Sequence, residues 1–178
     1  MSDIRVASRY AKSVFSLADE HSILEEVHND MVAIKDTVEG SRELELLLKS
    51  PIINSSKKLS ILNSLFGNSN DLTKKFFTLV VKKGREAELF ETAKQFHLLY
   101  NSKKGIEMAE VVTPFELTEE LRASFKQKVK QLSGKDSVEL KEKVDKSLIG
   151  GFILNIEGKQ IDDSVRTRLQ KLEQTLVK

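Results

Sequence analysis

The side chains that could support catalysis or metal binding are few and scattered through the sequence. The three histidines are His21, His28 and His97, and no group of carboxylates at helical spacing accompanies any of them. His21 and His28 would share a helix face only if the chain did not break near Ser22. None of the serines lies in a Gly-x-Ser-x-Gly elbow, and there is no cysteine. The sequence therefore predicts neither a metal site nor a catalytic centre.

The glycine pair Gly150-Gly151 is the one stretch that invites comparison with a phosphate-binding loop. Such a loop needs a Gly-Lys-Ser/Thr sequence and opens a helix, whose N-terminal N–H groups hold the phosphate. Here no such sequence follows, and the alternation of apolar residues after the pair indicates a strand. We therefore expect no nucleotide at this position and no cofactor elsewhere.

Two arginines, Arg166 and Arg168, follow two acids, Asp162 and Asp163. These four charges admit two interpretations, an active-site cluster or the N-terminus of a helix that begins after Asp163 or Ser164. Acids are favourable at the positive end of a helix dipole, and exposed arginines are ordinarily solvated or form a weak ion pair. The pattern favours the helix terminus.

Composition excludes several classes of partner. The chain has 178 residues, of which 39% are hydrophobic and 31% charged, and its formal net charge is +2. This balance gives no general attraction to nucleic acid or to anionic lipid. The lysine pairs 57–58, 74–75 and 82–83 are dispersed among acids, as on a solvated surface. No apolar run approaches the ~20 residues that span a bilayer, so we expect membrane association only through partners and no export.

The first half of the sequence reads as a series of helices. One starts at the N-terminus, and a second begins near Ser22, carries an apolar stripe and stops at Gly40. Four more are expected at about 42–49, 54–66, 70–83 and 85–101. Short connections between them predict a compact antiparallel bundle of six helices. The stripe of the second helix comprises Leu24, Val27, Met31, Ile34 and Val38.

The pattern changes after Gly105. A strand is expected from 106 to 117, where Pro114 restricts it to a sheet edge or a strand end, and Thr118 then caps a helix that ends at Gly134. Alternating apolar residues at 138–144 and 152–156 predict two further strands, and Glu157-Gly158 predicts a tight turn before a short third one. The expected inward residues of the helix at 118–134 are Leu121, Phe125, Val129 and Leu132, and those of the last helix are Val165, Leu169, Leu172 and Leu176.

These patterns predict an α+β protein that is mostly α. An N-terminal six-helix bundle, residues 1–104, is followed by a small C-terminal domain, residues 105–178, with a short β-sheet and two helices. The local pattern around the glycine pair is that of a small antiparallel sheet closed by the last helix, which is amphipathic.

The first and fifth helices carry more apolar residues than one buried stripe requires. Tyr10, Val14 and Leu17 flank the first stripe, and apolar residues nearly encircle the fifth helix from Phe76 to Val81. Two explanations remain open from periodicity alone. Either the two helices are central and fully buried, or they form a groove that accepts an amphipathic helix from a partner.

Several segments resemble one known family, in order and in spacing. At the N-terminus the matching segment is Arg9-Tyr10-Ala11-Lys12 with Phe15, and Gly84-Arg85 matches at the end of the fifth helix. The most specific block lies near the C-terminus, where Val144-Asp145-Lys146-Ser147, Ile149-Gly150-Gly151-Phe152, Ile161-Asp162, Ser164-Val165-Arg166 and Arg168-Leu169 follow one another. The chain therefore resembles the delta subunit of bacterial F-type ATP synthase, whose mitochondrial relative is the oligomycin-sensitivity-conferring protein.

The resemblance implies a non-catalytic stator subunit that serves ATP synthesis and hydrogen ion transport. Its N-terminal bundle would bind the N-terminal helix of an alpha subunit of the catalytic head, and its C-terminal domain would bind the b-type subunits of the peripheral stalk. Its location would be peripheral, on the cytoplasmic face of the bacterial plasma (inner) membrane. The residues implied at the alpha-subunit helix are Tyr10, Ser13, Val14, Phe76, Leu79 and Lys83. The C-terminal signature residues are Asp145, Gly150, Gly151, Asp162, Ser164, Arg166 and Arg168.

The alternative to a stator subunit is an adaptor that binds helical segments of another multi-subunit assembly, and its fold would be the same. An enzyme would require a pocket of perturbed ionisable groups, which the sequence does not display.

Overall fold

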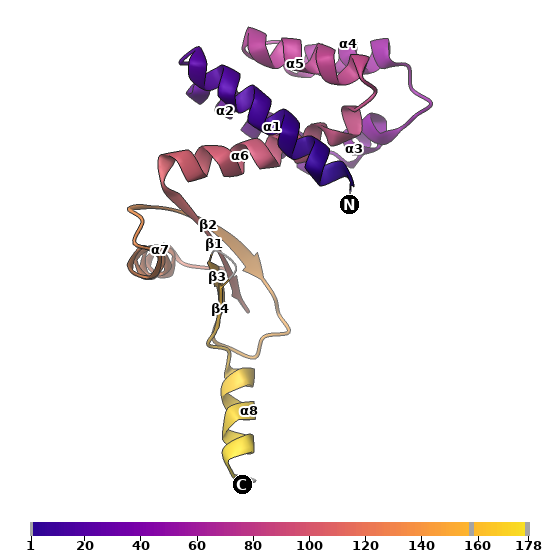
Figure 1. Cartoon of the computed structure of the whole chain (residues 1–178). Coiled ribbons are helices and arrows are strands. Elements are labelled where there is room, and N and C mark those ends of the chain that lie inside the picture. Colours follow the sequence, from indigo (N-terminus) through magenta and orange to yellow (C-terminus); the bar gives the residue numbers. More distant parts are fainter. Residues whose placement is uncertain (1, 157–158, 177–178) are drawn as a thin grey trace. The chain divides into compact units, whose positions relative to one another are not determined.

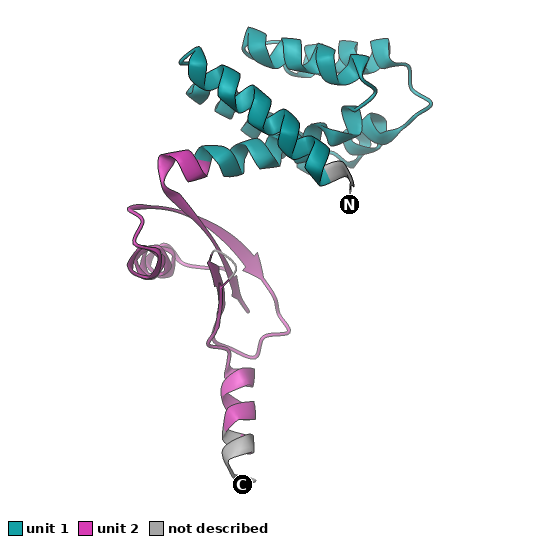
Figure 2. Ribbon diagram, viewed as in Figure 1, with its two compact units in different colours: residues 1–100 teal, residues 101–178 magenta. Residues whose placement is uncertain are grey.

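The chain forms two compact units. The computed structural model describes the backbone of residues 2–156 and 159–176 (Figure 1). Residues 1–100 make the first unit and residues 101–178 the second (Figure 2). The boundary expected after residue 104 lies at the last residue of helix α6 (Leu89–Lys104), four residues beyond this division. The predicted Glu157-Gly158 turn lies outside the described residues.

The first unit is the six-helix bundle that the sequence predicts, with one short 3₁₀ turn inserted before α6. Asparagines cap two of its helices, because the side chain of Asn54 accepts a hydrogen bond from the N–H of Ser56 and that of Asn70 from the N–H of Leu72. The elements before α6 are α1 (Ser2–Glu20), α2 (Leu24–Gly40), α3 (Arg42–Lys49), α4 (Ser55–Leu65), α5 (Asp71–Lys82) and η1 (Glu86–Glu88).

The core of the bundle follows the predicted stripes closely. All five apolar residues of the α2 stripe are buried, as expected from their spacing. A buried lysine joins three elements, because Lys58 of α4 donates to the carbonyl oxygen of Leu48 at 3.0 Å and lies 3.8 Å from the carboxylate of Glu86 in η1. Near the end of α4, Leu62 and Phe66 are buried and Leu65 is exposed.

The second unit is a four-stranded sheet with two helices. The sheet order is β2-β1-β3-β4, in which β1 and β2 run parallel and the other neighbouring pairs run antiparallel. The expectation of a purely antiparallel sheet is therefore wrong. Helix α7 lies between β1 and β2 in the chain and returns it to the starting end of β1, as a parallel neighbour requires. The elements are β1 (Ile106–Thr113), α7 (Glu119–Ser133), β2 (Ser137–Val144), β3 (Ile153–Ile156), β4 (Lys159–Asp162) and α8 (Val165–Leu176).

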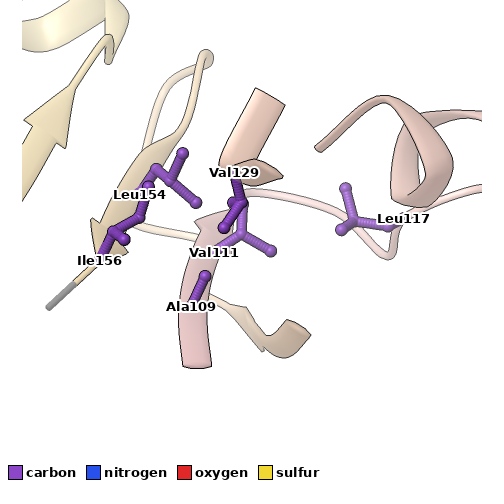
Figure 3. Packing of buried hydrophobic residues seen from close by; sticks show 6 residues of the cluster. All are labelled: Ala109, Val111, Leu117, Val129, Leu154 and Ile156. Atoms are coloured by element: carbon purple, nitrogen blue, oxygen red, sulfur yellow. The ribbon is translucent and has the colours of Figure 1, made fainter. Parts of the chain in front are cut away.

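Helix α7, and not α8, covers the sheet. Val129 of α7 packs with Val111 of β1 and Leu154 of β3, as Figure 3 shows, and Phe125 adds an edge-to-face contact with Phe152. The predicted inward positions Leu121 and Leu132 are exposed, whereas Val129 is completely buried and Phe125 is partly buried. Leu169 of α8 is also exposed, so α8 does not close the sheet as expected.

Replacement of Gly151 by alanine will destabilise the second unit strongly. Its φ is +79°, and an added Cβ would lie 2.3 Å from the carbonyl oxygen of Asp163, which is a backbone atom that cannot move alone. We expect a loss of about 3 kcal/mol or more in the free energy of unfolding of this unit. Hydrogen exchange measured peptide by peptide reports the stability of each unit separately.

Gly134→Ala is the matched control. Gly134 also has a positive φ, +71°, but nothing lies within 4 Å of the added Cβ. The free energy of unfolding of Gly134→Ala should therefore fall by only about 1 kcal/mol, the cost of placing alanine in a left-handed conformation. Equal losses for the two variants would show that the close contact between Gly151 and Asp163 has no energetic weight.

Candidate functional site

Helix α1 packs on the bundle through alanines, Val14 and Phe15, and leaves two other large apolar side chains exposed. Ala7, Ala11 and Ala18 are completely buried. In contrast, Ile4 is 56% exposed and Leu17 is 42% exposed. A helix that served only the core would bury its large apolar residues, because burial stabilises in proportion to apolar area. Ile4 and Leu17 depart from this expectation.

The exposed apolar residues of α1 adjoin those of α5. The rings of Tyr10 and Phe76 meet edge to face, with their centroids 6.0 Å apart. Leu17 lies seven residues after Tyr10, and Leu79 lies three residues after Phe76, so each projects beside this contact. Leu79 is 45% exposed. We call the surface formed by Tyr10, Ser13, Leu17, Leu72, Phe76 and Leu79 the α1–α5 face.

The structure brings together most of the residues that the family resemblance implies for partner binding. Tyr10 and Phe76 are in contact, and Ser13 and Leu79 are exposed beside them. Lys83 is exposed at the C-cap of α5. Val14 and Phe76 are both buried, with exposed fractions of 5% and 4%. Leu17 was not among the implied residues, although its spacing of seven from Tyr10 places it on the same helix face.

The C-terminal signature residues gather around the first turn of α8. The backbone N–H of Val165 donates to the carbonyl oxygen of Gly150 at 3.0 Å, and that of Asp163 donates to the carbonyl oxygen of Phe152 at 3.0 Å. The two glycines permit this approach, since a Cβ on Gly150 would lie 3.0 Å from the side chain of Val165. We call this junction, residues 145–151 and 162–168, the α8 base.

Two carboxylates organise the α8 base. Asp162 accepts hydrogen bonds from the N–H of Ser164 at 2.9 Å and from the hydroxyl of Thr167 at 2.8 Å, and these bonds lower the pKa of its carboxyl group. Asp145 accepts a bond from the N–H of Ser147 at 2.9 Å, and its hydrogen bonds to Ser147 lower its pKa likewise. Ser164 caps α8, because its Oγ accepts from the N–H of Thr167.

The two arginines of the signature also serve the α8 base. Arg166 donates to the carbonyl oxygen of Ser147 at 3.2 Å, and Arg168 donates twice to one carboxylate oxygen of Asp163, at 2.9 and 2.6 Å. The charged groups are therefore paired within a helix terminus. This arrangement is the one that the sequence favoured over an active-site cluster.

The histidines form a pair that the sequence did not predict. Nε2 of His28 on α2 lies 2.9 Å from Nδ1 of His97 on α6, and the ring of Tyr100 stacks on His28 with centroids 3.6 Å apart. The two residues are 69 positions apart, so no local pattern could reveal the contact. His21 is exposed. Among the described residues, no three histidines, aspartates or glutamates gather as metal ligands would.

Comparison with known proteins identifies the family. Residues 6–176 match the family described as ATP synthase delta (OSCP) subunit. The chain belongs to this family. The finding agrees with the expected role as a non-catalytic subunit in ATP synthesis and ion transport, and it favours ATP synthase over the adaptor of another assembly. Family members assemble into a membrane-associated complex, and no described helix here has the length and apolarity to cross a bilayer.

Bacterial relatives align over nearly the whole chain. The protein is 40% identical over 174 residues to "ATP synthase subunit delta" of Cytophaga hutchinsonii, covering 97% of this chain and 94% of that one. It is 38% identical over 176 residues to the protein of the same name from Christiangramia forsetii, covering 99% and 95%. A chain in the mitochondrial ATP synthase hexamer of Toxoplasma gondii has the same fold, with a TM-score of 0.77 over 97% of both chains at 24% identity.

Acid should loosen the α8 base before the bundle. The folded-state pKa values of Asp145 and Asp162 lie below their values in an unfolded chain, about 3.9. Their stabilisation is therefore complete above that value and is lost as the pH falls through the folded-state values. Hydrogen exchange at residues 159–168 should accelerate below about pH 4.

Asp162→Ala provides the test of this assignment. Without the carboxylate, exchange at residues 159–168 should be faster at neutral pH and should depend less on acid. Lys57→Ala, a change at an exposed residue of α4, is the control. An unaltered acid dependence in Asp162→Ala would contradict the role given to this carboxylate.

Proposed function

We propose that the protein is a stator subunit that joins the catalytic head of F-type ATP synthase to the b-type subunits of its peripheral stalk. The first unit binds the N-terminal helix of an alpha subunit on the α1–α5 face. The second unit binds the stalk. The joined structure resists the torque of the rotor and so couples proton transport to ATP synthesis, and the protein is held at the cytoplasmic face of the bacterial plasma membrane by these partners.

The observation that carries this proposal is the exposure of a leucine on each of two helices that touch. Leu17 of α1 and Leu79 of α5 keep close to half of their surfaces in water, and the helices meet through Tyr10 and Phe76. Fully buried central helices, the other explanation that periodicity left open, do not account for these exposed leucines. An amphipathic helix laid on the face would cover them, and a stable interface of ordinary size buries ~800 Å² on each partner.

Exposed apolar residues also occur on the second unit, where they suit a stalk partner. Leu169 on α8 and Ile149 in the loop of the α8 base are both exposed. The α8 base fixes the direction of α8 through backbone hydrogen bonds and so gives a partner helix a rigid element to pack against. We place the b-type subunits on this part of the second unit.

The substitution Leu79→Asp should weaken head binding. A carboxylate in the middle of the α1–α5 face would be desolvated against an apolar partner helix, at a cost of about 2 kcal/mol or more. Calorimetric titration with a synthetic N-terminal peptide of the cognate alpha subunit should show saturable one-to-one binding to the wild type and a loss of at least ~30-fold in the variant.

Leu98→Asp is the matched control for Leu79→Asp. Leu98 lies on α6, and its exposed fraction, 45%, equals that of Leu79. The control should bind the peptide as the wild type does. Normal affinity of a folded Leu79→Asp variant would remove the α1–α5 face from the proposal.

A chain that ends at Arg168 should keep head binding and lose stalk binding. This truncation removes most of α8 but retains the contacts of Asp162, Ser164 and Thr167 that form the α8 base. Pull-down with the soluble part of the b-type subunits tests the second unit, and titration with the alpha-subunit peptide tests the first. Equal loss of both activities would mean that the two units do not work as separate modules.

A further inference from the structure

The α1–α5 face lies between basic side chains. Between Ile4 and Glu20 and between Asp71 and Lys83, the two helices carry seven basic and three acidic residues. Their excess of four positive charges is larger than the net charge of the whole chain, which is +2. The basic residues are Arg5, Arg9, Lys12, Lys74, Lys75, Lys82 and Lys83, and the acids are Asp19, Glu20 and Asp71.

The lysines of α5 are placed in register with its leucines, of which Leu72 is half-buried and Leu79 exposed. Lys75 follows Leu72 by three residues, and Lys82 follows Leu79 by three residues, so the two lysines form a row beside the two leucines. Both lysines are exposed, as is Lys83 at the end of the helix. None of the three has an ion-pair partner among the residues that the structure describes. Their charge is therefore not neutralised within the chain.

The α1 side of the face is also basic over most of its length. Arg9 is exposed and precedes Tyr10, which makes the aromatic contact with Phe76. The acids of the two helices lie at their ends, at Asp3, Asp19 and Glu20 on α1 and at Asp71 on α5. Basic side chains thus accompany the apolar strip on both helices.

We propose that the helix recognised by the α1–α5 face carries acidic side chains along the edges of its apolar stripe, and that Lys75 and Lys82 select it, with Arg9 on the opposite side. This inference rests on the proposed function and specifies the chemistry of its partner. Opposite charges at the rim of an interface raise the association rate and exclude helices of the wrong charge, while the apolar centre supplies most of the affinity. An apolar strip with Lys75 and Lys82 on one side and Arg9 on the other suits an amphipathic helix better than a nucleic acid, whose backbone offers only charge.

The test uses the full chain and the synthetic N-terminal peptide of the cognate alpha subunit. A second peptide has each acid beside its apolar stripe replaced by lysine. Calorimetry should show that the second peptide binds the wild type at least ~10-fold more weakly, and that binding of the first weakens as salt rises from ~20 to ~300 mM. The double variant Lys75→Glu/Lys82→Glu should bind the first peptide ~10-fold more weakly and should recover affinity for the second.

Lys57→Glu/Lys126→Glu is the control, because it changes the net charge equally at exposed residues of α4 and α7. It should bind the first peptide as the wild type does. Circular dichroism confirms that each variant is folded. Recovery by the charge-swapped peptide cannot come from a structural defect, so it separates selection from stability.

Three results would overturn the inference. The first is peptide binding that does not change with salt and is equal in Lys75→Glu/Lys82→Glu and in the control variant, while Leu79→Asp still abolishes it. The proposed function would then stand without charge selection. The second is an alpha-subunit peptide without acids beside its stripe. The third is normal peptide binding by Lys75→Glu/Lys82→Glu together with loss of its binding to vesicles of anionic lipid, which would assign the lysines to a membrane surface. If no peptide binds and Leu79→Asp has no effect, the proposed function itself fails.

Discussion

The close packing of α1 through alanine is the constraint on which the first unit depends. Ala7, Ala11 and Ala18 have no exposed surface, so the helix backbone lies near the core. Leu17 is left on the outer surface. Covering the exposed half of a leucine contributes only about 1 kcal/mol, so Leu17 and Leu79 alone cannot hold a partner. The apolar stripe of the partner helix and the charges at the rim must supply the remainder of the binding free energy.

The second unit depends on a different constraint, the close backbone contact between Gly151 and Asp163. The segment around Gly151 approaches Asp163 so closely that a Cβ has no space, and Asp145 and Asp162 turn the chain on either side of this contact. The residues that carry the family signature thus hold the start of α8. Their arrangement explains why a segment that looks chemically active in the sequence contains paired charges and helix caps instead.

The sequence predicted the helical bundle more accurately than the sheet, for a physical reason. The burial of Leu24, Val27, Met31, Ile34 and Val38 depends on a period within one helix, which the sequence displays directly. The parallel pairing of β1 with β2 depends on where the intervening helix returns the chain, and no local pattern encodes that. The contact of His28 with His97 joins residues too distant for periodicity to connect.

The face for partner binding was predictable in part. An apolar surplus on the first and fifth helices was visible, but periodicity could not separate a buried helix from one with a second surface. In the structure each of the two helices buries one face and leaves a leucine exposed, Leu17 on α1 and Leu79 on α5. Val14 and Phe76, which the family resemblance implies for the partner surface, are both buried in the structure, and their roles in binding stay predictions.

The central claim is that the α1–α5 face receives the alpha-subunit helix. Backbone amide spectra of the isotopically labelled full chain, recorded by NMR with and without the alpha-subunit peptide, test it most directly. The largest shifts should occur at Tyr10, Ser13, Leu17 and Leu79, with residues 159–168 unchanged. Shifts confined to the second unit, or spread over α3 and α4 without α1 and α5, would contradict it.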